Sequence, residues 1–317
     1  MDGVLIIDKP AGLTSHDVVA RLRRTLLERR IGHTGTLDPF ATGVLVMLVG
    51  RATRLAQFLS GAEKEYYAVV RFGYSTDTGD LTGRPIGKLS DDATQVSPLS
   101  WSDSEIEEAL TSLRGVMDQV PPMYSAKKQG GRKLYELARR GETIERKPVR
   151  VEVRELEALR CDDRLLKDNE DGTVDLAFRI VCSAGTYIRT LAETLGVRLG
   201  VGAHLAELRR TRAGDFSITS AVTLEQIKAA VVDDAVGTFL IPLDKALASL
   251  PFVSLSGPDA RSVQQGVPIT VSGHSKGLAT QGENVRMRDV AGNLLAVGCY
   301  DAATQSLKPR VVISRDS

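Results

Sequence analysis

The stretch Val174-Asp175-Leu176-Ala177-Phe178-Arg179-Ile180-Val181-Cys182 carries an apolar side chain at every even-numbered position. A period of two places these side chains on one face of a strand, with the charged Asp175 and Arg179 on the other, which is typical of a half-buried sheet. Gly185 follows the strand, and apolar residues then recur at helical spacing until Gly196, which is predicted to end the helix. The stretch therefore predicts a helix packed against a sheet.

Strand patterns of the same kind occur elsewhere in the first 250 residues. Tyr66–Gly73 alternates with a period of two, and the apolar runs Val4–Ile7 and Val44–Val49 are typical of buried strands. Because strands and helices interleave without a regular β-α-β spacing, we expect an α+β fold rather than a doubly wound sheet. The expected architecture is a mixed, largely antiparallel sheet with flanking helices.

Three further helices are predicted from spacing and capping residues. The first begins at Thr14 or Ser15, and the second covers 102–113, with Asp103 or Ser104 near its cap. The third is short and carries two leucines and three arginines: Leu205, Leu208, Arg209, Arg210 and Arg212.

Beyond about Pro251 the sequence changes to short Val, Ile and Leu runs separated by Gly, Asp, Asn and Pro, as in a small all-β unit. We therefore expect a catalytic domain over residues 1–248 and a small β-rich domain over residues 249–317.

The composition, 42% hydrophobic and 26% charged, is that of an ordinary globular protein. The N-terminus lacks the basic start of a signal peptide, and the longest apolar run, Val44–Val49, is too short to span a bilayer. Cys161, Cys182 and Cys299 are scattered and odd in number, which fits a reducing compartment. We expect a cytoplasmic protein that does not bind membranes.

The net charge of +1 conceals an uneven distribution. Met123–Arg154 holds ten Lys or Arg against four Glu, a balance of +6, whereas Glu155–Asp175 holds eight acids against three bases, a balance of −5. Such a distribution concentrates positive potential where phosphates can bind, although a pair of solvated surfaces is an equally good interpretation of a charge run alone.

The loop Gly32-His33-Thr34-Gly35-Thr36-Leu37-Asp38-Pro39-Phe40-Ala41-Thr42-Gly43 is dense in polar and flexible residues. Its glycines let the backbone approach a bound group, and Pro39 holds Asp38 toward an extended conformation. The loop lacks the Gly-Lys-Ser/Thr pattern of a phosphate loop. By spacing alone, Asp38 is more often a turn residue than a functional carboxylate.

This loop resembles the active-site loop of the bacterial TruB family, the tRNA pseudouridine-55 synthases, and four further stretches agree in the family's order. They resemble its N-terminal motif, its tyrosine-bearing strand, the start of its RNA-binding insertion, and the segment with its active-site tyrosine and arginine. These stretches are Asp8–Ser15, Lys64–Tyr67, Pro121–Lys128 and Cys182–Thr190. The resemblance covers roughly residues 3 to 215.

The resemblance implies a pseudouridine synthase fold, an RNA-binding insertion at about residues 123–152, and a C-terminal β-domain of the PUA type. It implies that Asp38 is the nucleophile, that Arg189 holds this carboxylate ionised, and that Tyr66 stacks on uracil and accepts the C5 proton. The residues expected to bind substrate are His33, Tyr187, Lys9, Lys127, Lys128 and Leu208.

The implied reaction isomerises the uridine at position 55 in the T stem-loop of tRNA. It involves no net redox change or hydrolysis, so we expect no cofactor. We expect no metal either, because the four histidines (His16, His33, His204 and His274) lack ligand spacing. A buried uridine must first leave its stack, and His33 is a candidate to fill the gap, although a hydrogen-bonded loop histidine is nearly as good an interpretation. The protein is expected to act as a monomer without an obligate protein partner.

Two other function classes fit part of this pattern. A non-catalytic tRNA-binding or RNA-folding protein could use the same pocket only to hold a flipped base. A glycoside hydrolase also acts at an anomeric carbon but needs two carboxylates that flank the bond. Asp77 and Asp80 lie in a Thr- and Gly-rich turn, and the sequence offers no second acid in a setting like that of Asp38.

Overall fold

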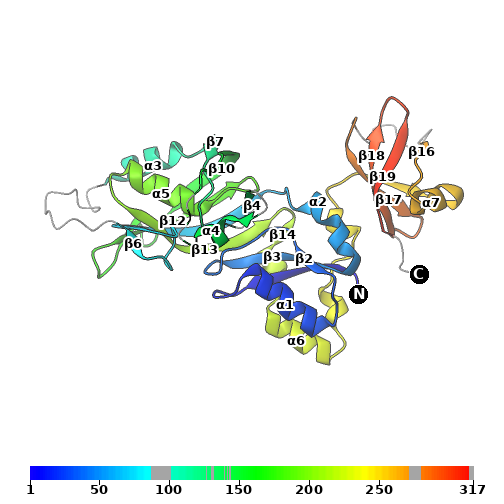
Figure 1. Ribbon diagram of the computed structural model, residues 1–317, viewed down its shortest axis with the longest axis horizontal. Coiled ribbons are helices and arrows are strands. Elements are labelled where there is room, and N and C mark those ends of the chain that lie inside the picture. Colours follow the sequence, from blue (N-terminus) through cyan, green and yellow to red (C-terminus); the bar gives the residue numbers. More distant parts are fainter. Residues whose placement is uncertain are drawn as a thin grey trace.

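The computed structural model describes residues 1–86, 101–125, 127–129, 132–138, 140, 142, 144–270 and 280–313. It contains a large sheet flanked by helices and a smaller C-terminal sheet (Figure 1). The α+β fold class expected from the sequence is confirmed.

The large sheet has ten strands. Neighbouring strands of this sheet run antiparallel, with one exception: β13 (Ala203–Ala213) runs parallel to β3 (Thr42–Val49). Seven strands follow one another in the order β1 (Gly3–Lys9), β3 (Thr42–Val49), β13 (Ala203–Ala213), β4 (Lys64–Phe72), β12 (Val174–Cys182), β10 (Val149–Leu159) and β7 (Gly115–Gln119). Three short strands pair with members of this row: β2 (Ile31–His33) with β3, β11 (Leu166–Asp168) with β12, and β14 (Phe216–Ser217) with β13. Two short hairpins complete the strands of this part: β5 (Ser75–Thr76) with β6 (Pro85–Ile86), and β8 (Lys128–Gln129) with β9 (Arg132–Lys133).

Four helices pack against this sheet and share one apolar core with it (Figure 1). The helices α1 (Ser15–Leu26) and α6 (Leu224–Val232) contact each other and lie against β2 and β1, respectively. The helix α3 (Asp103–Thr111) lies against β10, and α5 (Ile188–Arg198) lies against β13 and contacts α3. A continuous apolar core runs beneath all four. The shorter helices of this part are α2 (Ala56–Leu59) and α4 (Leu134–Ala138), with 3-10 turns at Gly50–Leu55, Ile218–Ser220, Val236–Phe239 and Lys245–Leu247.

The cap of the first helix is Thr14, one of the two expected residues, and that of α3 is Ser102, one residue before the expected positions. Both caps form capping boxes, which satisfy backbone N–H groups at the helix start. Within the described part of the chain, no helix is long and apolar enough to cross a membrane.

The predicted helix around Leu205 and Leu208 is wrong, because Ala203–Ala213 forms strand β13 in the centre of the sheet. Two register shifts against β4, between Leu205 and Glu207 and between Arg210 and Arg212, interrupt the period of two. A bulge of this kind moves a side chain to the other face, so the apolar residues recur at a spacing of three that imitates a helix.

The predicted end of α5 at Gly196 is also wrong, since the helix continues to Arg198. Gly196 instead lies where the helix passes close to β13, and a Cβ there would come within 2.6 Å of the Ala203 side chain. The glycine therefore permits close packing of helix on sheet rather than ending the helix.

The C-terminal part forms a five-stranded sheet with its own apolar core (Figure 1). A separate apolar cluster, which includes Leu55, Leu247, Val297 and Ile313, packs this sheet against the first part of the chain. Its elements are β15 (Phe252–Leu255), α7 (Gly257–Gln264), β16 (Ile269–Thr270), β17 (Asn284–Asp289), β18 (Leu294–Asp301) and β19 (Ser306–Val312).

Candidate active site

The loop that carries Asp38 connects β2 to β3 and is fixed at its centre by the first residue of helix α1. The backbone N–H of Leu37 donates to Ser15 Oγ at 2.9 Å, and Ser15 Oγ donates to the carbonyl of Leu37 at 3.2 Å. Both residues are buried. The backbone beside Asp38 is therefore held by a reciprocal pair of hydrogen bonds.

Two buried cations hold the rest of this loop. Lys9 Nζ donates to the carbonyls of Pro10, Leu13 and Pro39. Arg210 donates from Nε to Val44 O at 2.6 Å and from its Nη atoms to the carbonyls of Gly35 and Thr36. Lys9 thus ties the loop at Pro39, just after Asp38, to the segment that precedes α1, whereas Arg210 binds carbonyl oxygens on both sides of Asp38.

The Asp38 carboxylate forms a two-point ion pair with Arg189 at the start of α5. Arg189 Nε lies 2.9 Å from Asp38 Oδ2, and Nη2 donates to Oδ1 at 3.2 Å. Arg189 is 4% exposed and also donates to the carbonyls of Thr78 and Tyr124. Because guanidinium and carboxylate are planar, two parallel contacts fix the direction as well as the distance of the pair.

A second carboxylate, that of Asp80, lies beside the same guanidinium. Its Oδ2 is 3.7 Å from Arg189 Nη1, and its Oδ1 accepts hydrogen bonds from the Thr78 and Thr82 hydroxyls and from the backbone N–H of Thr82. Asp80 is 5% exposed. It therefore helps to orient Arg189 from the side opposite Asp38.

Burial raises the pKa of the Asp38 carboxyl above its ordinary value. The Arg189 guanidinium acts against this effect through its charge and its hydrogen bond, the negative charge of Asp80 adds to it, and Lys9 opposes it weakly. The ion pair with Arg189 is thus the main interaction that keeps Asp38 available as an anion.

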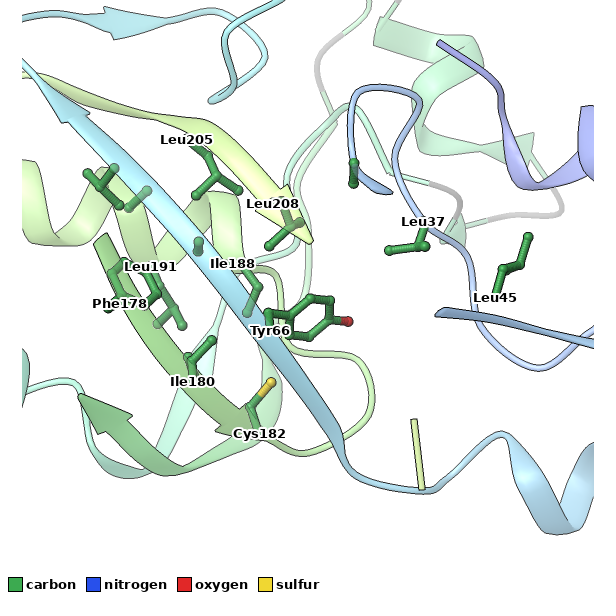
Figure 2. Close-up of a cluster of buried hydrophobic side chains, with 14 of the residues drawn as sticks. Leu37, Leu45, Tyr66, Phe178, Ile180, Cys182, Ile188, Leu191, Leu205 and Leu208 are labelled. Atoms are coloured by element: carbon green, nitrogen blue, oxygen red, sulfur yellow. The ribbon is translucent and has the colours of Figure 1, made fainter. Parts of the chain in front are cut away.

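A pocket of about 290 Å³ opens at this ion pair, near the lower limit for ligand pockets. Asp38, Arg189 and Tyr66 of β4 all line it. Figure 2 shows Tyr66 at the end of the apolar cluster, with its hydroxyl directed toward the Leu37 side and away from Phe178 and Leu191. Burial raises the pKa of Tyr66, and the neighbouring Arg210 opposes that rise.

Three of the other expected residues line the same pocket: Tyr187, Leu208 and Lys127. The backbone of Tyr187 is held by the Gln119 side chain, which accepts from Tyr187 N at 2.7 Å and donates to Tyr187 O at 3.0 Å. Burial raises the pKa of the Tyr187 hydroxyl, so it stays a neutral phenol. The structure therefore brings six of the nine expected site residues around one cavity.

Of the other three expected residues, His33 and Lys9 lie outside that lining. His33 sits at the end of β2 against His16, with ring centroids 5.6 Å apart, and its Nδ1 is buried without a hydrogen-bond partner. Burial lowers the pKa of His33 to about 4, so the ring is neutral near pH 7. Lys9 is 0% exposed and holds the loop from behind. Lys128 belongs to β8, and its side chain lies outside the described residues.

The sequence prediction missed Asp80 and Arg210. Asp80 was set aside as a turn residue, and its proximity to Arg189 arises only from the folding of the chain. Arg210 lay in the segment predicted as a helix, where it would be one surface arginine among several. An alternation with allowance for a bulge would have placed it on the buried face of a strand.

Within the described residues, no group of three or more His, Cys, Asp and Glu side chains has an arrangement that could hold a metal ion.

Comparisons with known proteins identify the family of this chain. Residues 23–188 match the N-terminal domain of TruB family pseudouridylate synthases, and residues 189–248 match the C-terminal domain of tRNA pseudouridylate synthase B. A tRNA pseudouridine synthase B from Geobacillus thermodenitrificans (strain NG80-2) is 46% identical over 266 residues, which cover 84% of this chain and 85% of that protein. A protein of the same name from Solibacter usitatus (strain Ellin6076) is 40% identical over 298 residues, which cover 94% of this chain and 95% of that protein.

Solved structures show the same fold. The chain is similar to one from an H/ACA RNP bound to a substrate RNA containing 2'-deoxyuridine, with a TM-score of 0.71 and 26% identity over 99% of this chain and 85% of that chain. It is also similar to a chain of a Cbf5-Nop10-Gar1 complex, with a TM-score of 0.69 and 27% identity over 99% and 84% of the two chains. The sequence and fold similarities both extend over most of the molecule, and this chain belongs to the TruB family of pseudouridylate synthases.

Proposed function

We propose that this protein isomerises the uridine at position 55, in the T stem-loop of tRNA, to pseudouridine. The observation that carries the proposal is the two-point ion pair of Asp38 with Arg189 in the lining of a pocket that Tyr66 also lines. This arrangement provides an oriented carboxylate next to an aromatic ring on which a base can stack. The names of the bacterial relatives point to the same substrate class.

The proposed roles follow from the contacts. Asp38 acts as the nucleophile, and Arg189 keeps it ionised and fixes its direction. Tyr66 stacks on the uracil and accepts the proton that C5 loses when the base is reattached through that carbon. The reaction has no net redox change and adds no water to the product, so we propose that it needs no cofactor.

The RNA has to present a uridine that has left its stack. We propose that the neutral His33 ring stacks in the emptied place and that Tyr187 and Leu208 contact the flipped nucleoside. Lys127 and Lys128 of the insertion (residues 123–152) would contact phosphates. Lys9 was expected to bind substrate, but its buried ammonium holds carbonyls of the loop, so we propose that it positions Asp38 instead.

The remaining assignments concern the whole protein. We propose a catalytic domain over residues 1–248 and a PUA-like RNA-binding domain over residues 249–317. The protein is proposed to act in the cytoplasm as a monomer, without an obligate protein partner.

A glycoside hydrolase reading is disfavoured by the setting of the second carboxylate. Asp80 Oδ1 already accepts three hydrogen bonds, and Asp80 does not line the pocket. It cannot flank a scissile bond opposite Asp38 as that chemistry requires. A non-catalytic tRNA-binding or RNA-folding protein remains the second candidate, because the same pocket would hold a flipped base.

The test of the proposed function is incubation with an unmodified tRNA transcript, followed by mapping of pseudouridine. We expect one new pseudouridine, at position 55 in the T loop. Product at another position would refute the site assignment, and binding without any product would favour the tRNA-binding alternative.

A further inference from the structure

Arg210 lies directly opposite Tyr66 in the sheet. The two are cross-strand partners of β13 and β4, and both line the pocket. Side chains that oppose each other on one face of an antiparallel pair have Cβ atoms about 4.5–5.5 Å apart. Arg210 is 2% exposed, so its guanidinium lies beneath the Tyr66 side of the pocket and not in solvent.

The charge of Arg210 lacks the partner that its neighbours on the same strand have. Arg209 pairs with Asp8 at 2.7 Å, and Arg212 pairs with Glu63 at 2.7 Å. Arg210 donates to three carbonyl oxygens and interacts with the Tyr66 side chain, and it has no ion pair with a carboxylate in the part of the chain that the structure describes. A buried charge without a counter-ion is costly and is expected where negative charge develops during function.

We propose that Arg210 is a positioning residue for pseudouridine formation, and that its guanidinium holds the Tyr66 oxygen and stabilises the negative charge on it. This inference rests on the proposed function, because it concerns the step in which Tyr66 removes the C5 proton.

In that step, C5 carries both its original hydrogen and the new bond to C1′. The C5–H bond breaks, and its proton passes to the Tyr66 oxygen. The electron pair of that bond re-forms the C5–C6 double bond, while the electron pair of the C6–N1 double bond moves to N1, which takes up a proton from solvent. Tyr66 accepts it as a phenolate, whose own proton was previously released to solvent, and returns to that state after product release. Arg210 makes the phenolate easier to form.

Other ionisable groups face Tyr66 and affect the same oxygen. Cys182 of β12 and Asp38 of the loop disfavour a phenolate, whereas Arg210 favours it. Lys64, on the same strand as Tyr66, is buried and donates to the carbonyls of Ser60 and Ala62. Burial raises the pKa of the Cys182 thiol to about 11, which leaves it neutral. Arg210 is thus the cation best placed to favour the phenolate.

Arg210 also holds carbonyl oxygens of the Asp38 loop, so its alternative role is to support that loop and not to stabilise the phenolate. The two roles predict different results. Lys9 provides the matched control: it is equally buried, binds the carbonyl of Pro39 in the same loop, and has no place opposite Tyr66. Loss of loop support should slow the reaction whether or not Tyr66 has its hydroxyl. Loss of phenolate stabilisation should matter only when the hydroxyl is present.

The test is a double-mutant cycle on the single-turnover rate of pseudouridine formation in an unmodified tRNA transcript. Arg210→Gln should slow the wild-type reaction roughly tenfold or more, but by much less in a Tyr66→Phe background. Lys9→Gln should have the same effect in both backgrounds. Arg210→Lys keeps the charge, so it should slow the reaction less than Arg210→Gln, and again more in the wild-type background than in the Tyr66→Phe background. This variant keeps the test valid if Arg210→Gln does not fold.

The pH profile gives a second readout. The Arg210→Gln rate should recover as the pH rises, because the phenolate then forms without help, while a defect of loop structure would persist at every pH. Equal losses in the two Tyr66 backgrounds, or an unshifted pH profile, would overturn the role of Arg210. A wild-type protein that makes no pseudouridine would instead refute the proposed function.

Discussion

At the scale of single residues, the site is governed by competition between burial and charge around Asp38. Burial raises the pKa of this carboxyl, and Asp80 adds to the rise. Arg189 opposes both through a contact at 2.9 Å that is itself largely shielded from water. Removal of either partner of such a buried pair leaves an uncompensated charge, so the two residues act as a unit.

The first prediction concerns the acid side of the pH–rate profile. As the pH falls, protonation of Asp38 removes the nucleophile, and because its pKa is raised the loss begins above the ordinary range of an aspartate. Arg189→Gln removes the main effect that lowers this pKa and should move the acid limb to higher pH. Single-turnover rates across pH measure the limb.

Arg209→Gln is the matched control for that experiment. Arg209 also forms an ion pair with an aspartate, Asp8, but its side chain is 34% exposed and lies outside the pocket. The control should leave the acid limb in place. An Arg189→Gln profile with the wild-type limb would contradict the assigned role of Arg189.

The sequence identified the residues of the ion pair but not all of their surroundings. Asp38, Tyr66 and Arg189 stand in recognisable motifs, and the fold brings all three to one pocket. Asp80 could not be identified, because Asp77 and Asp80 look alike in the same turn and differ only in what lies beside them. Only tertiary structure shows that Asp80 faces Arg189.

At the scale of elements, the decisive feature is the contact between the start of α1 and the Asp38 loop. Thr14 caps the helix, and the next residue, Ser15, turns its hydroxyl away from the helix to hold Leu37. The cap stabilises the start of the helix, whereas the Ser15 hydroxyl itself holds the backbone next to Asp38. Helix α1 supports the site without contributing a side chain to the pocket lining.

The second prediction separates helix stability from loop geometry. Ser15→Ala leaves the buried N–H of Leu37 without its partner, at a cost of about 1–3 kcal/mol, and should lower the single-turnover rate while tRNA affinity stays within error. Thr14→Ala removes the cap of the same helix and costs about 1 kcal/mol of stability. It should leave the rate unchanged.

Thermal unfolding, tRNA binding and single-turnover rates of the two variants provide the comparison. A rate loss in Thr14→Ala as large as that in Ser15→Ala would mean that overall helix stability, and not the Ser15–Leu37 contact, supports the site.

The elements themselves were predictable where a single period runs through them. The strands β4 and β12 and the helix α1 follow their periods of 2 and 3.6 without interruption, and each was identified correctly. The strand β13 was mistaken for a helix because two bulges shift its register. With these bulges, Leu208 pairs with Ala68 and Arg210 pairs with Tyr66. The register shifts that made the strand resemble a helix therefore also place Leu208 and Arg210 in the lining of the pocket.

At the scale of the whole molecule, the C-terminal sheet is joined to the first part by a buried arginine as well as by apolar contacts. Arg286 of β17 binds the Asp244 carboxylate at 2.9 Å and the carbonyls of Leu250 and Ala248, which belong to the connecting segment. Arg54 donates to the carbonyl of Val312 from the other side. These contacts fix the C-terminal sheet relative to the catalytic pocket.

The central claim is that the Asp38 carboxylate converts a bound uridine rather than merely holding it. Pseudouridine formation releases the hydrogen of C5, so a transcript labelled with tritium at C5 of uridine reports each conversion. Release of tritium by wild-type protein and by Asp38→Asn, with tRNA affinity measured for both, is the most direct test. We predict release from one uridine per tRNA by the wild type and none by Asp38→Asn at equal affinity; release by Asp38→Asn at the wild-type rate would contradict the account.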